Sequence, residues 1–105
     1  MSHEESHRAT FLVVIASRLL KDALLSMITD VGIHLVSASY CLGTVKASYL
    51  MNTLGLVPEE NKVLITCVST KSKTDTVLKL LVKEFSFNEP NTGIAFTIPV
   101  DHITY

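Results

Sequence analysis

The chain has 105 residues, the size of one domain, and is 48% hydrophobic but only 18% charged. Charged residues usually supply about a quarter of a soluble domain, so this chain is short of solvating surface. A compact monomer with an apolar skin or an obligate oligomer would have this composition, and we favour the oligomer because small domains gain most from extra buried area. The net charge of −1 and the scattered basic residues argue against binding to nucleic acid through its phosphates.

The N-terminal segment 1–10 is polar and lacks the apolar core of a signal peptide. We expect it to be a disordered lead, followed by one folded domain over 11–105. No apolar run reaches the roughly 18 residues that a transmembrane helix needs. The sequence therefore predicts a cytoplasmic protein without membrane insertion.

The first half of the domain predicts a strand, a helix and a second strand. Residues 11–16 form a continuous apolar run of strand length. From 19 to 31 the apolar spacing becomes helical, with Ser17 as the N-cap and Gly32 as the residue that closes the helix. Residues 33–42 alternate loosely and predict the second strand. The apolar stripe expected on the helix consists of Leu20, Ala23, Leu24, Met27, Ile28 and Val31.

The second half predicts a strand, a helix and a strand. These elements cover 62–69, 74–85 and 94–100. The whole order, β-α-β-β-α-β, is that of the ferredoxin-like α+β fold. Right-handed crossovers would place both helices on one face of a four-stranded antiparallel sheet. The opposite face would then stay uncovered and expose a large apolar patch.

The final strand carries the strongest sign of assembly. Its residues alternate between two faces without a charge on either, Ile94, Phe96 and Ile98 on one and Ala95 and Thr97 on the other. We therefore expect both faces to be buried, until Pro99 ends the strand. A second copy of the chain is the expected cover for the second face.

The connection between the second and third strands, 43–61, is much longer than the two to five residues of an ordinary hairpin loop. A connection of this length is commonly functional or disordered. Its apolar residues argue against disorder, and we expect Ser48 to cap a short helix that ends at Gly55.

The two cysteines, Cys41 and Cys67, fall in predicted strands and match neither a zinc site nor a secreted disulfide framework. If these strands form a hairpin centred near Leu54, the two thiols would lie opposite each other. The other interpretation, which we favour, is that both are small buried hydrophobic residues in a reducing cytosol.

Three pieces of the sequence together resemble the nitrogen-regulatory P-II family, and more closely its divergent P-II-like members. The first is the apolar opening, Leu-Val-Val-Ile at 12–15, with the helix after it. The second is Gly-Thr-Val-Lys-Ala-Ser-Tyr-Leu-Met-Asn-Thr-Leu-Gly-Leu at 43–56. The third is Pro-Asn-Thr-Gly-Ile-Ala-Phe-Thr-Ile-Pro-Val-Asp at 90–101. The resemblance covers nearly the whole of 11–105 and implies a homotrimer of ferredoxin-like subunits whose sheets line the centre.

The resemblance also implies a signalling protein without catalytic chemistry of its own. Members of the family bind adenine nucleotides in clefts between neighbouring subunits. Their T-loop, here 43–61, changes shape with the ligand and docks on a regulated enzyme or transporter. Their B-loop, here 88–93, wraps the phosphates.

The nucleotide-binding residues that the resemblance implies lie in these two loops: Gly43, Thr44, Lys46, Asn91, Thr92 and Gly93. Each also has an ordinary interpretation, as the start of a loop, a solvated charge or a turn. The family's B-loop is rich in glycine and carries a lysine, whereas 88–93 has one glycine, no lysine and the acidic Glu89. We therefore expect an adenine nucleotide, which could be AMP, cyclic AMP, ADP or ATP, with AMP or cyclic AMP ahead of ATP.

The residues form no Ser/His/Asp or Cys/His constellation, so we expect neither an enzyme nor a metal site. Two alternatives stay open beside the nucleotide sensor. One is a ferredoxin-like trimer that binds a metal or a small anion. The other is a scaffold subunit that senses no ligand.

Overall fold

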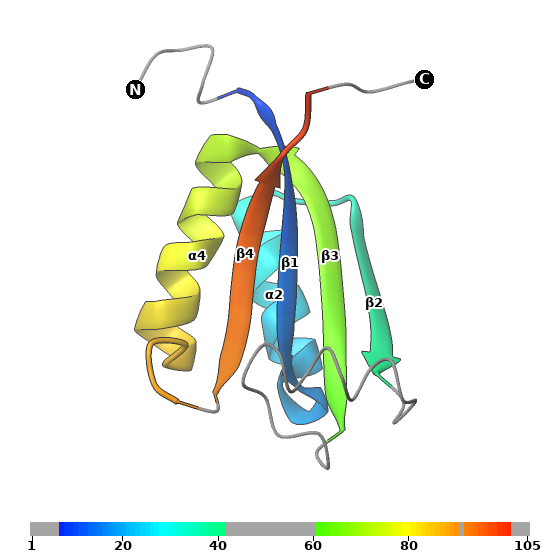
Figure 1. The fold of residues 1–105 in the computed structure, drawn as a ribbon, viewed down its shortest axis with the longest axis vertical. Helices are drawn as coiled ribbons and strands as arrows, with labels where there is room; N and C mark the ends of the chain where they lie inside the picture. Colours follow the sequence, from blue (N-terminus) through cyan, green and yellow to red (C-terminus); the bar gives the residue numbers. More distant parts are fainter. Residues whose placement is uncertain (1–6, 42–60, 91, 102–105) are drawn as a thin grey trace.

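The structure is a computed structural model that describes residues 7–41, 61–90 and 92–101. Its strands are β1 (Ala9–Ser17), β2 (Val36–Cys41), β3 (Lys62–Thr70) and β4 (Gly93–Pro99). Its helices are the 3-10 helix η1 (Arg18–Leu20) and the α-helices α2 (Lys21–Val31) and α4 (Lys71–Phe85). The predicted order β-α-β-β-α-β is confirmed, and both α-helices cover the same face of the sheet (Figure 1). In the part of the chain that the structure describes, no helix has the length and apolar character to cross a membrane.

The sheet has the strand order β2-β3-β1-β4, and every neighbouring pair is antiparallel. β1 lies between two partners, so that Leu12 pairs with Cys67 of β3 on one side and with Thr97 of β4 on the other. The position of β1 explains its continuous apolar run, because a strand buried on both faces has no place for alternating polar residues. β1 begins at Ala9, two residues before the predicted start.

The main core lies between the sheet and the two helices. Side chains from β1, β3, α2 and α4 fill it: Leu12, Val14, Ala16, Leu24, Met27, Ile28, Ile33, Val63, Ile65, Cys67, Val77 and Leu81. The predicted stripe of α2 is confirmed except at Ala23, which is exposed. On the other face of the sheet Val13 and Ile15 form a smaller cluster with Phe11, Leu64 and Ile94 packed around them.

The helix ends follow the predicted capping chemistry with two differences. The Oγ of Ser17 accepts a hydrogen bond from the N–H of Leu19 at 3.3 Å, so Ser17 caps η1 rather than α2. Gly32 closes α2 as predicted, with a φ of 101° that favours glycine. Helix α4 begins three residues earlier than predicted, because Thr70 caps it by accepting from the N–H of Lys73 at 3.4 Å.

The face of the sheet opposite the helices remains open at β4. Ala95 packs against the main core, whereas Phe96 and Ile98, on the other face, are 39% and 47% exposed. The prediction that both faces of β4 are buried therefore holds within one chain only for the face that meets the helices. What covers the second face is a question of assembly.

The hypothesis that the two thiols lie opposite each other is wrong. The register of β2 and β3 pairs Cys41 with Lys62, and Val36 with Cys67. The connection between β2 and β3 is therefore not centred near Leu54, as the hypothesis required. Cys67 is a free, buried thiol that is 2% exposed, and burial raises its pKa to about 11. The short helix expected between Ser48 and Gly55 lies outside the described residues.

The buried Cys67 gives the first prediction. Its raised pKa keeps the thiol protonated at neutral pH, and only the thiolate reacts with disulfide reagents. In a Cys41→Ser variant we expect no modification of the native protein at mildly alkaline pH and complete modification after unfolding in urea. The absorbance of the chromophore that the reagent releases measures both reactions. Rapid labelling of the native protein would contradict the burial of Cys67.

The close contact between Gly93 and Phe87 gives the second prediction. A Cβ on Gly93 would lie 2.5 Å from Cζ of Phe87 and 3.0 Å from the backbone oxygen of Ile15. We expect Gly93→Ala to lower the free energy of unfolding by about 1–3 kcal/mol, because the ring must move out of its packed position. Urea unfolding measures this loss.

A Phe87→Leu background is the control for that experiment, since leucine lacks the ring atoms that meet the added methyl group. We expect Gly93→Ala to cost less in this background than in the wild-type chain. An equal loss in both backgrounds would show that the ring is not the cause.

Candidate functional site

β2 ends and β4 begins at the same end of the sheet, and these two strands adjoin the loops that are predicted to bind the nucleotide. A row of paired residues crosses the sheet there, because Cys41 pairs with Lys62, Lys62 pairs with Ser17, and Ala16 pairs with Gly93. β1 and β2 run towards this end while β3 and β4 start from it. The chain therefore leaves β2 and enters β4 at the same end of the sheet, the lower end in Figure 1.

Of the predicted nucleotide-binding residues, the structure describes Thr92 and Gly93, whereas Gly43, Thr44, Lys46 and Asn91 lie outside the described residues. Thr92 is half-buried, and Gly93 is the first residue of β4. The two predicted halves of the site join the sheet at its opposite edge strands, β2 and β4. Three strand spacings, roughly 14 Å, separate these two edges of the sheet.

The turn before β4 is built by the backbone. Helix α4 ends at Ser86, which has a φ of 58°, and the N–H of Phe87 donates to the carbonyl of Leu81 at 3.1 Å. The N–H of Glu89 then donates to the carbonyl of Ser86 at 2.9 Å, and the side chain of Glu89 is exposed. The acidic residue that distinguishes this turn therefore faces solvent, at the edge of β4.

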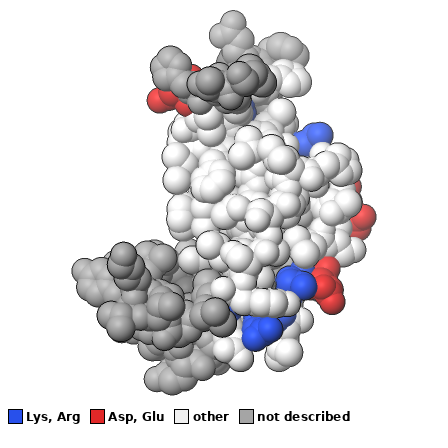
Figure 2. Space-filling view, turned by 90° about the vertical axis from the view of Figure 1, so that its right-hand side faces the viewer, with Lys and Arg blue, Asp and Glu red and all other residues white. Residues whose placement is uncertain are grey.

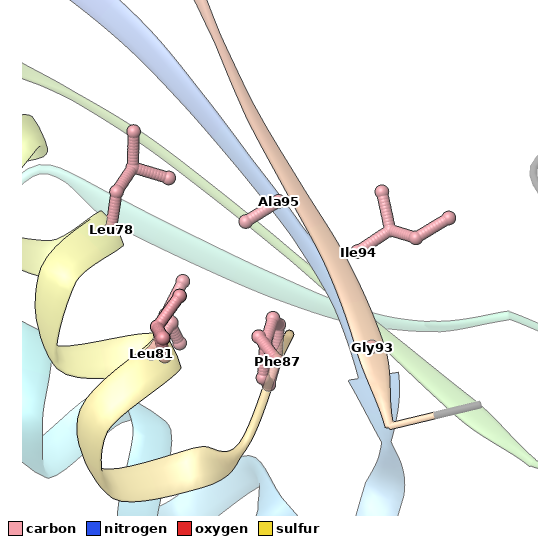
Figure 3. A pocket seen from close by; sticks show the side chains of 7 residues that line it. Leu78, Leu81, Phe87, Gly93, Ile94 and Ala95 are labelled. Atoms are coloured by element: carbon pink, nitrogen blue, oxygen red, sulfur yellow. The ribbon is translucent and has the colours of Figure 1, made fainter. Parts of the chain in front are cut away.

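A cavity of about 320 Å³ lies between α4 and β4 beside this turn. Its lining is apolar: Leu78, Leu81, Val82, Phe87, Gly93, Ile94 and Ala95. Figure 3 shows Leu78, Leu81 and Ala95 around the cavity, with Phe87 between the helix and the strand, while the side chain of Ile94 points away from the helix. No charged or hydroxyl side chain is among these described lining residues, so no side chain of the cavity could hold a phosphate.

A basic cluster at the same end of the sheet is a feature that sequence reasoning missed. The guanidinium of Arg18 lies 3.8 Å from the centroid of the Tyr40 ring, and Nζ of Lys21 donates to the Tyr40 hydroxyl at 3.1 Å. The hydrogen bond from Lys21, and then the nearby guanidinium of Arg18, lowers the pKa of Tyr40, while the bond to Tyr40 raises the pKa of Lys21. Tyr40 is 44% exposed, so the cluster is open to solvent.

Topology could have revealed this cluster. β1 and β2 are parallel to each other, so Arg18, which follows β1, and Tyr40, near the end of β2, must lie at the same end of the sheet. Lys62, the first residue of β3, adds a third basic side chain to this end and is 1% exposed. Among the described residues, no three side chains of His, Cys, Asp or Glu are grouped to hold a metal.

The comparison with known proteins gives structural neighbours only. No family model matches the chain, and no curated protein matches it. A PII-like signalling protein from Thermus thermophilus superimposes with a TM-score of 0.65 at 15% identity, over 90% of this chain and 87% of that one.

Two further solved structures have the same arrangement. CPII from Thiomonas intermedia, bound to ADP, AMP and acetate, gives a TM-score of 0.65 at 14% identity over 91% of each chain. PII from Arabidopsis thaliana, bound to citrate, gives 0.63 at 18% identity over 90% of this chain and 78% of that one. These identities are low, but the likeness spans nearly the whole chain. The chain has the fold of the PII-like signalling proteins, as the resemblance in its sequence indicated.

Proposed function

We propose that the chain is a PII-like signalling protein that forms a homotrimer and binds an adenine nucleotide in clefts between neighbouring subunits. The loop 43–61 relays the bound state to a regulated enzyme or transporter. The observation that carries the proposal is that β2 ends and β4 begins at the same end of the sheet, but at its two opposite edges.

This placement favours a site between subunits. The connection after β2 and the turn before β4 are separated by β3 and β1 within one chain. When subunits are arranged around an axis, the β2 edge of one can meet the β4 edge of the next, and the two loops then enclose one ligand. Each cleft would contain residues 43–46 from one subunit and residues 91–93 from its neighbour.

The open face of the sheet supports the trimer. β1, β3 and β4 each place apolar side chains on this face: Phe11, Val13, Ile15, Leu64, Val68, Ile94, Phe96 and Ile98. The register also places Thr66 and the buried Lys62 there, and no acidic side chain of these three strands. Val13 and Ile15 are already buried within one chain, whereas Phe96 and Ile98 are exposed, and exposed apolar side chains of this kind mark protein interfaces. A central contact between three such faces would bury them and explain the low charged fraction of the chain.

The neighbours support the class of ligand, since CPII was solved with ADP and AMP. The exposed Glu89 in the B-loop favours a ligand with fewer phosphates, because a carboxylate repels a triphosphate more strongly than a monophosphate. AMP or cyclic AMP is thus the ligand we propose first. The signal is a population shift, in which the nucleotide favours the loop arrangement that it contacts best.

The third prediction tests the ligand. We expect AMP or cyclic AMP to raise the thermal unfolding midpoint of the purified protein, with ATP and ADP giving smaller shifts, each measured with and without magnesium. A ligand at 100 times its dissociation constant adds about 2.7 kcal/mol to stability. Thr92→Ala should weaken binding about fivefold through the loss of one hydrogen bond.

Thr76→Ala is the matched control, because Thr76 is an exposed threonine on α4 whose hydroxyl donates to the carbonyl of Ser72, away from the proposed site. It should leave the nucleotide shift unchanged. A trimer that responds to none of the four nucleotides contradicts the proposal. A response to citrate, acetate or a metal alone would favour the ferredoxin-like trimer that binds a small anion or a metal.

The fourth prediction tests the trimer. Ile98→Asp places a charge on the open face and should convert the trimer to monomers, as measured by light scattering after size exclusion. Val82→Asp is the matched control, since Val82 is 48% exposed, close to the 47% of Ile98, but lies on α4. If the Ile98→Asp variant stays trimeric, the open face is not the subunit interface.

A further inference from the structure

Arg18 and Lys21 form a pair of cations that neither the fold nor the proposed cleft requires. Three elements hold the cluster: Arg18 belongs to η1, Lys21 begins α2, and Tyr40 lies in β2. The backbone is anchored on each side, because the N–H of Arg18 donates to the carbonyl of Asn61 at 3.1 Å and Ser17 caps η1. The cluster is therefore a positioned arrangement built from residues distant in the sequence.

Neither cation has a carboxylate partner within ion-pair distance among the described residues. The chain pairs other basic side chains, since Arg8 contacts Asp101 and Lys71 contacts Asp75 at 2.8 Å. Asp22 follows Lys21 directly and helps to raise the pKa of Lys21, but it forms no ion pair with it. The Tyr40 ring thus contacts two positive side chains, and no described carboxylate forms an ion pair with either of them.

The N–H groups of Arg18 and Lys21 that do not bind Tyr40 are suited to donate hydrogen bonds to an oxyanion. A guanidinium stacked on a ring keeps its N–H groups in its own plane, where they can form paired hydrogen bonds with phosphate or carboxylate oxygens. The ammonium of Lys21 has three N–H donors, one of which is used by Tyr40. Figure 2, which faces the β2 side, shows basic side chains gathered in a small area of a mostly uncharged surface, with an acidic side chain beside them.

We propose that Arg18, Lys21 and Tyr40 form a binding site for a small oxyanion with two or more negative charges, either a phosphate group or a polycarboxylate. Tyr40 shares a face of β2 with Val36, which packs against the core between sheet and helices. The site therefore lies on the helix side of the sheet, whereas the open face lies on the other. It requires neither the trimer nor a nucleotide, so it stands apart from the proposed function.

The fifth prediction tests this site in the full chain with three probes: inorganic phosphate, citrate and AMP. Thermal unfolding is measured in each probe against sodium chloride at equal ionic strength. Phosphate stabilises proteins generally by exclusion from their surface, so the comparison between variants decides the outcome. We expect Arg18→Gln with Lys21→Gln to weaken phosphate or citrate binding at least tenfold, as two charge-assisted contacts are lost.

Lys79→Gln with Lys83→Gln is the matched control, because it removes the same charge from the exposed side of α4. This variant should bind the probes within twofold of the wild-type chain. Arg18→Lys keeps the charge but loses the planar fork, so it should weaken binding by an intermediate factor, and it tests the site even if the double variant fails to fold.

The pattern across probes separates the sources of the oxyanion. Loss of phosphate or citrate binding with an unchanged AMP response supports a site for a free anion. Loss of all three responses supports a site that holds the phosphate of the nucleotide. A double variant that folds and keeps the full wild-type response to phosphate and citrate overturns the proposal, as does an Arg18→Lys variant with wild-type affinity.

Discussion

The pairing of β1 with a neighbour on each side is the constraint on which the rest of the structure depends. Because β3 and β4 are both antiparallel to β1, both begin at the end where β1 and β2 finish. The alternation along β1 divides the apolar side chains between two faces, with Val14 in the main core and Val13 in the smaller cluster opposite. The ends at which the chain enters and leaves each strand follow from this arrangement, as does the face on which Phe96 and Ile98 are exposed.

The two edges of the sheet then have complementary roles. β2 leads into the proposed T-loop, and β4 follows the proposed B-loop, so a ligand between them would join two subunits rather than two parts of one. In the proposed trimer, ligand binding would be linked to assembly, because a ligand that binds only the trimer would stabilise it. The basic cluster of Arg18, Lys21 and Tyr40 differs in this respect, because one chain contains all of it.

Much of the fold could be predicted from the sequence because it depends on local patterns. Helical spacing and the glycine at position 32 located α2, and a β-branched run located β4. The failures concern relations between distant residues. The positions of Cys41 and Cys67 depend on strand register, which a long connection does not reveal. The basic cluster escaped notice because Arg18 and Tyr40 meet only through the parallel arrangement of β1 and β2. Of the predicted site, the structure describes only Thr92 and Gly93.

The central position of β1 also has a consequence for how the chain folds. β1 is the first strand in the sequence, while its neighbours are the third and the fourth, so its hydrogen bonds close loops that span most of the domain. Contacts of such long range slow folding. On the ribosome, the apolar β1 leaves the exit tunnel well before Gly93–Pro99 is synthesised, and one of its edges stays unpaired during that interval. The apolar residues of β1 are therefore open to aggregation until both β3 and β4 have been synthesised and have paired with it.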